Sequence, residues 1–87
     1  METEFEIRTP QEFTRVLREI KHALASGKLR QVRPAQAAFA MDDITSVNED
    51  GPWPDYVEAY FEDVSTRAVY KLAVETYHGA GGSWARQ

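Results

Sequence analysis

Apolar residues recur at helical spacing near the start of the chain. Five of them lie three or four positions apart and so form one stripe on a helix: Phe13, Val16, Leu17, Ile20 and Leu24. Thr9 is suited to cap free backbone amides, Pro10 suits the first helical position, and Glu12 completes a capping box. Gly27 is a helix stop signal. The pattern predicts an amphipathic helix from about Pro10 to Ser26.

Alternation of apolar and polar residues near the end of the chain predicts a β-hairpin formed by Tyr56–Asp63 and Ala68–Tyr77. If Val57 pairs with Val74, one face consists of Val57, Ala59 and Phe61 opposite Val74, Leu72 and Tyr70. The other face then carries Tyr56, Glu58, Tyr60 and Glu62 opposite Glu75, Ala73, Lys71 and Val69. A slip of one residue would mix the two sets, so the pattern selects this register.

The other segments give weaker signals. Glu4–Arg8 alternates apolar and charged residues and predicts a short strand, whereas Lys28–Arg33 alternates less clearly. From residue 35 to residue 47 the signal is poor. Ile44–Val47 is compatible with a strand, and a second short strand would have Ala37, Phe39 and Met41 on one face. Asn48–Pro54 consists of turn residues and prolines, so it predicts a loop.

Together these segments predict a single α+β domain, residues 1–87, in which one amphipathic helix packs on a small antiparallel sheet. The chain has no cysteine, which excludes a disulfide scaffold and a thiolate metal site. No stretch approaches the roughly 20 apolar residues that cross a bilayer. The first residues are acidic where a secretory signal is basic. We therefore expect a cytoplasmic protein that does not enter a membrane.

The net charge of −4 is unevenly distributed along the chain. From Arg8 to Arg33 there are seven Lys or Arg against two Glu, which gives +5. From Asp42 to Asp63 there are eight carboxylates and no Lys or Arg, which gives −8. This asymmetry indicates either an interaction surface or a basic element that lies beside an acidic one inside the fold. Because the domain as a whole is acidic, nucleic-acid binding is not expected.

The stretch ETYHGAGGSW, residues 75–84, has three glycines within Gly79–Gly82, between His78 and Trp84. Phosphate-binding glycine loops need a following helix whose free amides point at the anion, and too few residues follow here to form one. The lysine of a P-loop is also missing. Two interpretations remain: a flexible turn that lets Trp84 fold back and pack, and a loop whose glycines let a partner's backbone approach closely.

Residue spacing predicts no catalytic or metal site. His22 and His78 are the only histidines, and nothing in their spacing brings them to shared carboxylates. On a strand, His78 shares a face with Thr76 and not with a carboxylate, so no catalytic triad results. Glu58 and Glu62 would lie about 13 Å apart along a strand, further than the roughly 5–9.5 Å of glycosidase pairs. We therefore expect no cofactor, no metal ion and no catalysis.

The acidic, aromatic hairpin is instead typical of a protein-binding surface. Tyr and Trp dominate the binding energy at such surfaces, and carboxylates steer a basic partner. The residues predicted to contact a partner are Trp53, Tyr56, Glu58, Tyr60 and Glu62, with His78 and Trp84 in the adjoining loop. The competing interpretation is an ordinary solvated sheet face. An exposed strand edge would also permit self-association into a homo-oligomer.

Residues 53–84, WPDYVEAYFEDVSTRAVYKLAVETYHGAGGSW, resemble the sheet region of small bacterial toxin-immunity proteins. The resemblance consists of an acidic, aromatic hairpin followed by a glycine-rich turn. It implies a protein without catalysis that blocks a cognate toxin, often a nuclease, whose basic active site would suit the acidic face. The predicted function is thus a small cytoplasmic protein-binding module that inhibits a basic partner. The alternative is a small-ligand-binding protein, or a minor enzyme, that uses His78 and the adjoining glycines.

Overall fold

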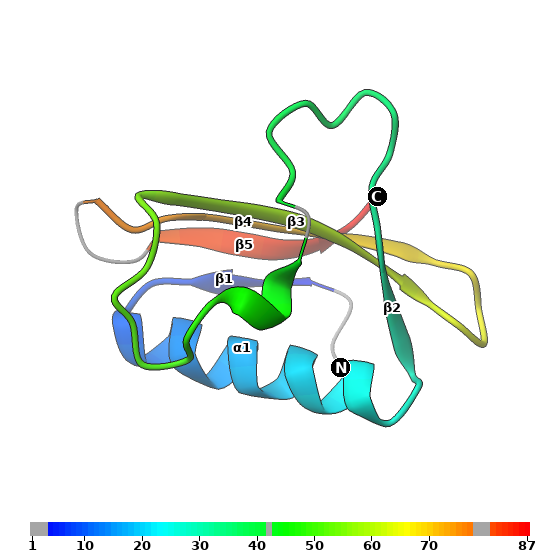
Figure 1. The fold of residues 1–87 in the computed structure, drawn as a ribbon, viewed down its shortest axis with the longest axis horizontal. Coiled ribbons are helices and arrows are strands. Elements are labelled where there is room, and N and C mark those ends of the chain that lie inside the picture. Colours follow the sequence, from blue (N-terminus) through cyan, green and yellow to red (C-terminus); the bar gives the residue numbers. More distant parts are fainter. Residues whose placement is uncertain (1–3, 42, 78–80) are drawn as a thin grey trace.

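The computed structural model describes residues 4–41, 43–77 and 81–87. Over these residues an α-helix packs on a five-stranded antiparallel sheet, which confirms the predicted α+β fold (Figure 1). In chain order the elements are β1 (Glu4–Ile7), α1 (Pro10–Ala25), β2 (Leu29–Val32), the 3₁₀-helix η1 (Ile44–Ser46), β3 (Tyr56–Asp63), β4 (Val69–Glu75) and β5 (Gly81–Arg86).

The strands lie in the order β1-β5-β4-β3-β2, and each neighbouring pair is antiparallel. Strands β2 to β5 form a meander, and β1 completes the sheet beside β5 at the edge opposite β2. Because α1 connects the two edge strands, it has to cross the width of the sheet, and Figure 1 shows it along one face. Within the described residues, the other face has no helix on it.

Helix α1 begins and ends where the sequence predicts. The Thr9 hydroxyl accepts a hydrogen bond from the Glu12 amide at 3.1 Å, and the Glu12 carboxylate accepts one from the Arg8 amide at 3.2 Å. In the usual capping box this carboxylate bonds to the amide of the capping residue, so here it reaches one residue further back. At the other end Gly27 has φ +78°, a left-handed conformation that glycine adopts without strain.

The predicted hairpin is confirmed together with its register. The pairs run from Tyr56 opposite Glu75 to Glu62 opposite Val69, each with the partner that the alternation selects. As a result, the face of the hairpin with Phe61, Tyr70 and Leu72 points toward α1, and the face with Tyr56, Tyr60 and the glutamates points away from it. The short strands expected near the start of the chain and before residue 33 are also present, as β1 and β2.

Strand β5 is the element that the sequence does not predict. It pairs with β4 on one side and β1 on the other, so this half of the glycine-rich stretch is a central strand and not a turn. A Cβ at Gly82 would lie 1.9 Å from the Ala73 carbonyl oxygen and 2.7 Å from the Val74 Cα, which explains why glycine stands there. The remainder of the stretch, His78 with residues 79 and 80, lies outside the described residues.

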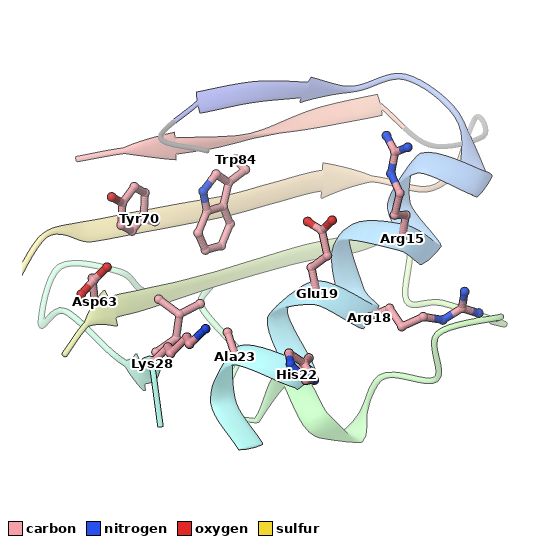
Figure 2. Close-up of a pocket in the computed structure, with 10 residues that line it drawn as sticks. Arg15, Arg18, Glu19, His22, Ala23, Lys28, Asp63, Tyr70 and Trp84 are labelled. Atoms are coloured by element: carbon pink, nitrogen blue, oxygen red, sulfur yellow. The ribbon is translucent and has the colours of Figure 1, made fainter. Parts of the chain in front are cut away.

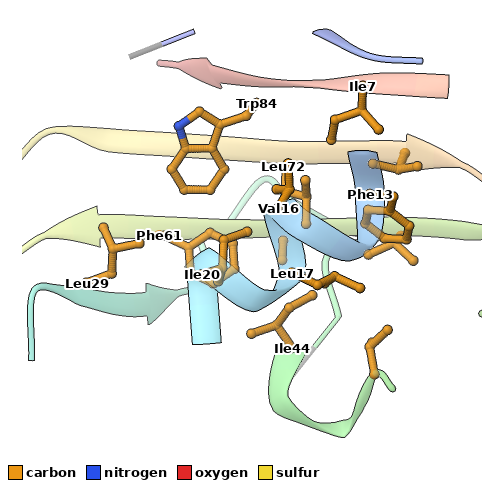
Figure 3. Close-up of a cluster of buried hydrophobic side chains, with 14 of the residues drawn as sticks. Ile7, Phe13, Val16, Leu17, Ile20, Leu29, Ile44, Phe61, Leu72 and Trp84 are labelled. Carbon is orange, nitrogen blue, oxygen red and sulfur yellow. The ribbon is translucent and has the colours of Figure 1, made fainter. Parts of the chain in front are cut away.

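The hydrophobic core lies between α1 and the sheet (Figure 3). Trp84 of β5 is 1% exposed, and its ring stacks on that of Tyr70 at a centroid distance of 5.1 Å. The largest fully buried side chains are Trp84, Phe13, Phe61, Ile7, Leu17, Ile20, Ile44, Leu72, Val57 and Val74. Trp84 therefore packs in the core, as one interpretation of the tail predicts, but as a strand residue. Its side chain is 1% exposed, so almost none of it is available for the predicted contact with a protein partner.

Residues 33–41 and 43–47 contain no strand. Ile44–Ser46 is a 3₁₀-helix capped by Asp43, whose carboxylate accepts a hydrogen bond from the Thr45 amide at 2.9 Å. The strand expected over Ile44–Val47 is therefore wrong. Residues 33–41 form a loop, here called the 33–41 loop, which Figure 1 shows on the side of the sheet away from α1. Its end is attached to β3, because the Met41 amide donates a hydrogen bond to the Glu58 carbonyl at 2.8 Å.

Candidate functional site

The side of the sheet away from α1 is called the outer face. Side chains point alternately to the two faces of a sheet along each strand, so the pairing of the strands shows which residues lie on the same face as Tyr60. These residues are Glu4, Glu6, Arg30, Val32, Tyr56, Glu58, Tyr60, Glu62, Val69, Lys71, Ala73, Glu75, Gly81, Ser83 and Ala85. In the part of the chain that the structure describes, the 33–41 loop is the segment that Figure 1 shows over this face.

The two tyrosines of the outer face are held by charged neighbours. Tyr56 is 47% exposed, and its hydroxyl donates a hydrogen bond to the Glu58 carboxylate at 2.7 Å. Burial, together with this bond to Glu58, raises the pKa of Tyr56 to about 12, so the phenol stays protonated at neutral pH. The Lys71 ammonium lies 5.8 Å from the centre of the half-buried Tyr60 ring, in cation–π range. Lys71 thus lies opposite Tyr60, as the predicted register requires.

The two glutamates expected to orient a partner are engaged within the protein. Glu58 is only 8% exposed, although the sequence places it on a solvated face. The attachment of the 33–41 loop to β3 at this residue, which alternation does not reveal, explains its burial. The Glu62 carboxylate accepts a hydrogen bond from the Arg30 guanidinium at 2.6 Å, which holds the pKa of Glu62 below its usual value. Glu62 is half-buried and lies 3.6 Å from Arg67 as well.

The two tryptophans are not on the outer face. Trp53 packs edge-on against Phe13 of α1 at a centroid distance of 4.8 Å, and its indole nitrogen donates a hydrogen bond to the Asn48 carbonyl at 2.8 Å. Trp84 is the core residue described above. Of the seven residues predicted to contact a partner, the outer face therefore brings together four, namely Tyr56, Glu58, Tyr60 and Glu62. His78 lies outside the described residues.

Phe39 is a candidate contact that the sequence analysis does not identify. Its side chain is 82% exposed, in the 33–41 loop. Ala37 and Ala40 on either side are buried, and the Gln31 side chain donates a hydrogen bond to the Met41 carbonyl at 3.1 Å. The loop is therefore attached to the sheet and presents the phenyl ring outward. A lone aromatic residue among alanines, without helical or strand spacing, is the sequence signal for it.

The basic and acidic halves of the chain partly neutralise each other, as one of the two interpretations of the charge pattern predicts. The Arg18 guanidinium lies 3.5 Å from the Glu49 carboxylate, and the Lys21 ammonium donates a hydrogen bond to the Val47 carbonyl at 2.6 Å. The outer face nevertheless keeps an acidic excess. The register gives it five carboxylates, Glu4, Glu6, Glu58, Glu62 and Glu75, against two cations, Arg30 and Lys71.

The described residues contain neither a metal-binding cluster nor a membrane span. No three of their His, Asp or Glu side chains are grouped so as to hold a metal ion. Helix α1, the longest helix in this part of the chain, is neither long nor apolar enough to cross a bilayer. The outer face, with its aromatic and acidic groups, is thus the site from which a function has to be argued.

The chain was also compared with known proteins. No protein-family model, no curated protein and no solved structure matches it. The resemblance of residues 53–84 to toxin-immunity proteins therefore remains a prediction. Support for a function therefore comes from the physical properties of the outer face and the 33–41 loop.

Proposed function

We propose that the protein is a binding module that contacts a basic protein partner through its outer face and the 33–41 loop. The observation that supports this most is the acidic, tyrosine-bearing sheet face beside the exposed Phe39 ring. Neither α1 nor any other described helix lies on that face. A partner laid against it would meet aromatic side chains that the fold already holds in position.

The aromatic residues would supply most of the binding energy. Phe39 and Tyr56 are exposed, and Tyr60 is half-buried opposite Val32 of the edge strand β2. Aromatic anchors at the centre of an interface typically cost about 2 kcal/mol or more when truncated to alanine. Because the 33–41 loop is attached to β3, little conformational entropy would be lost when Phe39 docks.

The carboxylates would select the partner and accelerate its approach. The outer face has three more carboxylates than cations, so it attracts a positively charged surface. Glu58, which is buried, and Glu62, which is paired with Arg30, would carry less of this attraction than the exposed Glu4. More specifically, the protein would inhibit a basic toxin. The resemblance to toxin-immunity proteins suggests a nuclease as the class of this toxin.

The proposal is tested by affinity capture with matched charge reversals. The wild-type protein and its Glu75→Lys and Phe39→Ala variants are immobilised, and proteins captured from cells that carry the gene are quantified by mass spectrometry. The Glu19→Lys variant is the control, because it makes the same charge change on α1, on the opposite side of the sheet. The product of the neighbouring gene is the first purified protein to test in the same way.

We expect a basic protein that the wild type and Glu19→Lys capture equally. Its retention should fall about tenfold or more with Phe39→Ala, and should fall with Glu75→Lys more strongly at low salt than at high salt. A captured protein that is acidic, or that all three variants retain equally, would contradict the proposal. If only Glu19→Lys failed to capture the partner, the binding surface would lie on α1 and not on the outer face.

The alternative function, a ligand site formed by His78 and the glycines, gains no support from the described part of that stretch. Gly81 and Gly82 belong to a central strand. The space that a side chain at Gly82 would fill is occupied by the backbone of β4 at Ala73. The glycine at this position therefore serves the packing of two strands, and it leaves no room for a ligand there.

A further inference from the structure

A pocket of about 510 Å³ opens between α1 and the sheet, on the side opposite the outer face (Figure 2). Tyr70 and Trp84 line it with their rings stacked on each other, so the half-buried Tyr70 presents more of its ring to the pocket than Trp84, which is 1% exposed. Leu29 of β2 and Ala23 of α1, both buried, add apolar walls. The volume lies within the range of about 300–1,000 Å³ that is usual for small-molecule sites. Shape and lining therefore suit a small ligand with a flat apolar body.

Charged side chains surround the mouth of this pocket, and two of them are already engaged elsewhere. The Arg18 guanidinium is 3.5 Å from the Glu49 carboxylate. The Asp63 carboxylate accepts hydrogen bonds from the Ser65 hydroxyl at 2.8 Å and the Ser65 amide at 2.9 Å, which complete the turn after β3. The ion pair weakens the attraction of Arg18 for an anion, whereas the neutral donors on Asp63 leave the charge of its carboxylate intact.

Two further cations and one carboxylate line the pocket without such partners. Lys28 and Arg15 form no ion pair with any residue that the structure describes, and the same is true of Glu19. Figure 2 draws Lys28 at the sheet end of the pocket, with Arg15 and Glu19 on α1. The pocket lining thus carries three cations, Arg15, Arg18 and Lys28, against two carboxylates, Glu19 and Asp63, on a chain whose net charge is −4.

We propose that this helix–sheet pocket binds a small carboxylate whose body is flat and apolar, such as an aromatic acid. The ring would lie against Tyr70 and Trp84 between Leu29 and Ala23, and the carboxylate would point to the mouth, where Lys28 is available. The three cations of the lining outnumber its two carboxylates, so an anion is favoured over a neutral or cationic analogue. The pocket lies on the opposite side of the sheet from the outer face, so this inference is independent of the proposed function.

Three probes of the same shape and different charge test the proposal: naphthoate, naphthylmethanol and naphthylmethylammonium. Each is titrated into the isotopically labelled protein, and the two indole N–H signals are followed by NMR. Trp84 lines the pocket, whereas Trp53 packs on Phe13 and serves as an internal reference. The variants are Lys28→Ala and, as its matched control on the outer face, Lys71→Ala.

Naphthoate is expected to shift the Trp84 signal and to bind about threefold to tenfold more tightly than naphthylmethanol, with naphthylmethylammonium weakest. Lys28→Ala should remove most of this preference, and Lys71→Ala should preserve it. Three outcomes would overturn the proposal: equal affinity for all three probes, equal effects of the two lysine variants, or no shift of Trp84 at millimolar naphthoate. Lys28 is exposed, so its variant is expected to fold. Ala23→Leu, which fills the pocket, should abolish binding if its spectrum remains native.

Discussion

The substitution Gly82→Ala tests the placement of β5, the strand that the sequence did not reveal. A Cβ at residue 82 would lie 1.9 Å from the Ala73 carbonyl oxygen and 2.9 Å from its carbonyl carbon. These are backbone atoms of a neighbouring strand, which cannot rotate away as a side chain would. The two strands would have to separate by about 1 Å locally before the contact became tolerable.

The cost of this separation follows from the contacts that it disrupts. Forcing extra atoms into a packed site costs about 1–3 kcal/mol. Weakening two backbone hydrogen bonds between β4 and β5 adds about 0.5–1.5 kcal/mol each. We therefore expect Gly82→Ala to lower the free energy of unfolding by about 2–6 kcal/mol. Native proteins of ordinary stability have about 5–15 kcal/mol in total, so this loss would be severe.

Gly81→Ala provides a matched control one residue away. A Cβ at Gly81 meets nothing within 4 Å, so this variant should stay within about 0.5 kcal/mol of the wild type. Urea unfolding followed by tryptophan fluorescence measures both variants, because Trp84 lies in the same strand and is buried. If the two alanine variants had equal stabilities, β5 would not pair with β4 as described.

Three further predictions concern the helix cap, the hairpin turn and the exposed phenylalanine. Thr9→Ala removes the hydroxyl that accepts from Glu12, and should lower the free energy of unfolding by about 0.5–2 kcal/mol in a urea titration; an unchanged midpoint would contradict the cap. Hydrogen bonds from the Ser65 side chain, then from the backbone of Thr66 and Ser65, lower the pKa of Asp63. Its ionised form therefore stabilises the fold above the ordinary aspartate pKa of about 3.9, and this contribution is lost as the pH falls through the lower folded-state pKa. Asp63→Asn should accordingly be less stable than the wild type at neutral pH, with a gap that narrows in acid; a gap that is constant with pH would contradict the assignment. Phe39→Ala should change stability by less than about 0.5 kcal/mol, because the ring is 82% exposed, whereas Phe61→Ala should cost about 3–5 kcal/mol because that ring is fully buried. Thermal unfolding by circular dichroism distinguishes the two, and a large loss with Phe39→Ala would mean that the ring packs in the fold.

The sequence predicts α1 and the β3–β4 hairpin well, because local rules determine both. The helix has a capping residue, one apolar stripe and a glycine stop, and these signals agree with one another. The hairpin has a register that only one alignment of apolar residues satisfies. Neither element needs a contact with a distant segment in order to form, so composition and spacing are sufficient to predict both.

Elements that depend on distant contacts are not predictable from spacing. Gly81–Arg86 contains two glycines and little alternation, and it becomes a strand because β4 and β1 pair with its two edges. Glu58 has the spacing of a solvated residue, yet the 33–41 loop returns to β3 at that position and buries it. Ile44 is a core residue in a 3₁₀-helix of three residues, which is too short for any periodic signal.

The residues of the candidate site also divide into those that local spacing predicts and those that depend on distant contacts. Tyr56 and Tyr60 share the predicted face because strand alternation places them there. Phe39, which alternation does not place, is presented by a loop whose conformation depends on Gln31 and on the attachment of Met41 to β3. The pocket between α1 and the sheet is lined by residues that are far apart in the sequence, such as Ala23, Tyr70 and Trp84, so no local pattern predicts it.

The most direct test of the binding surface is an NMR map of the labelled protein with its captured partner. Our account predicts that the largest chemical-shift changes occur at Phe39, Tyr56 and Lys71, and that the signals of Arg15 and Glu19 on α1 stay unchanged. Changes confined to α1, with Phe39 and Tyr56 unaffected, would contradict the outer face as the site of contact.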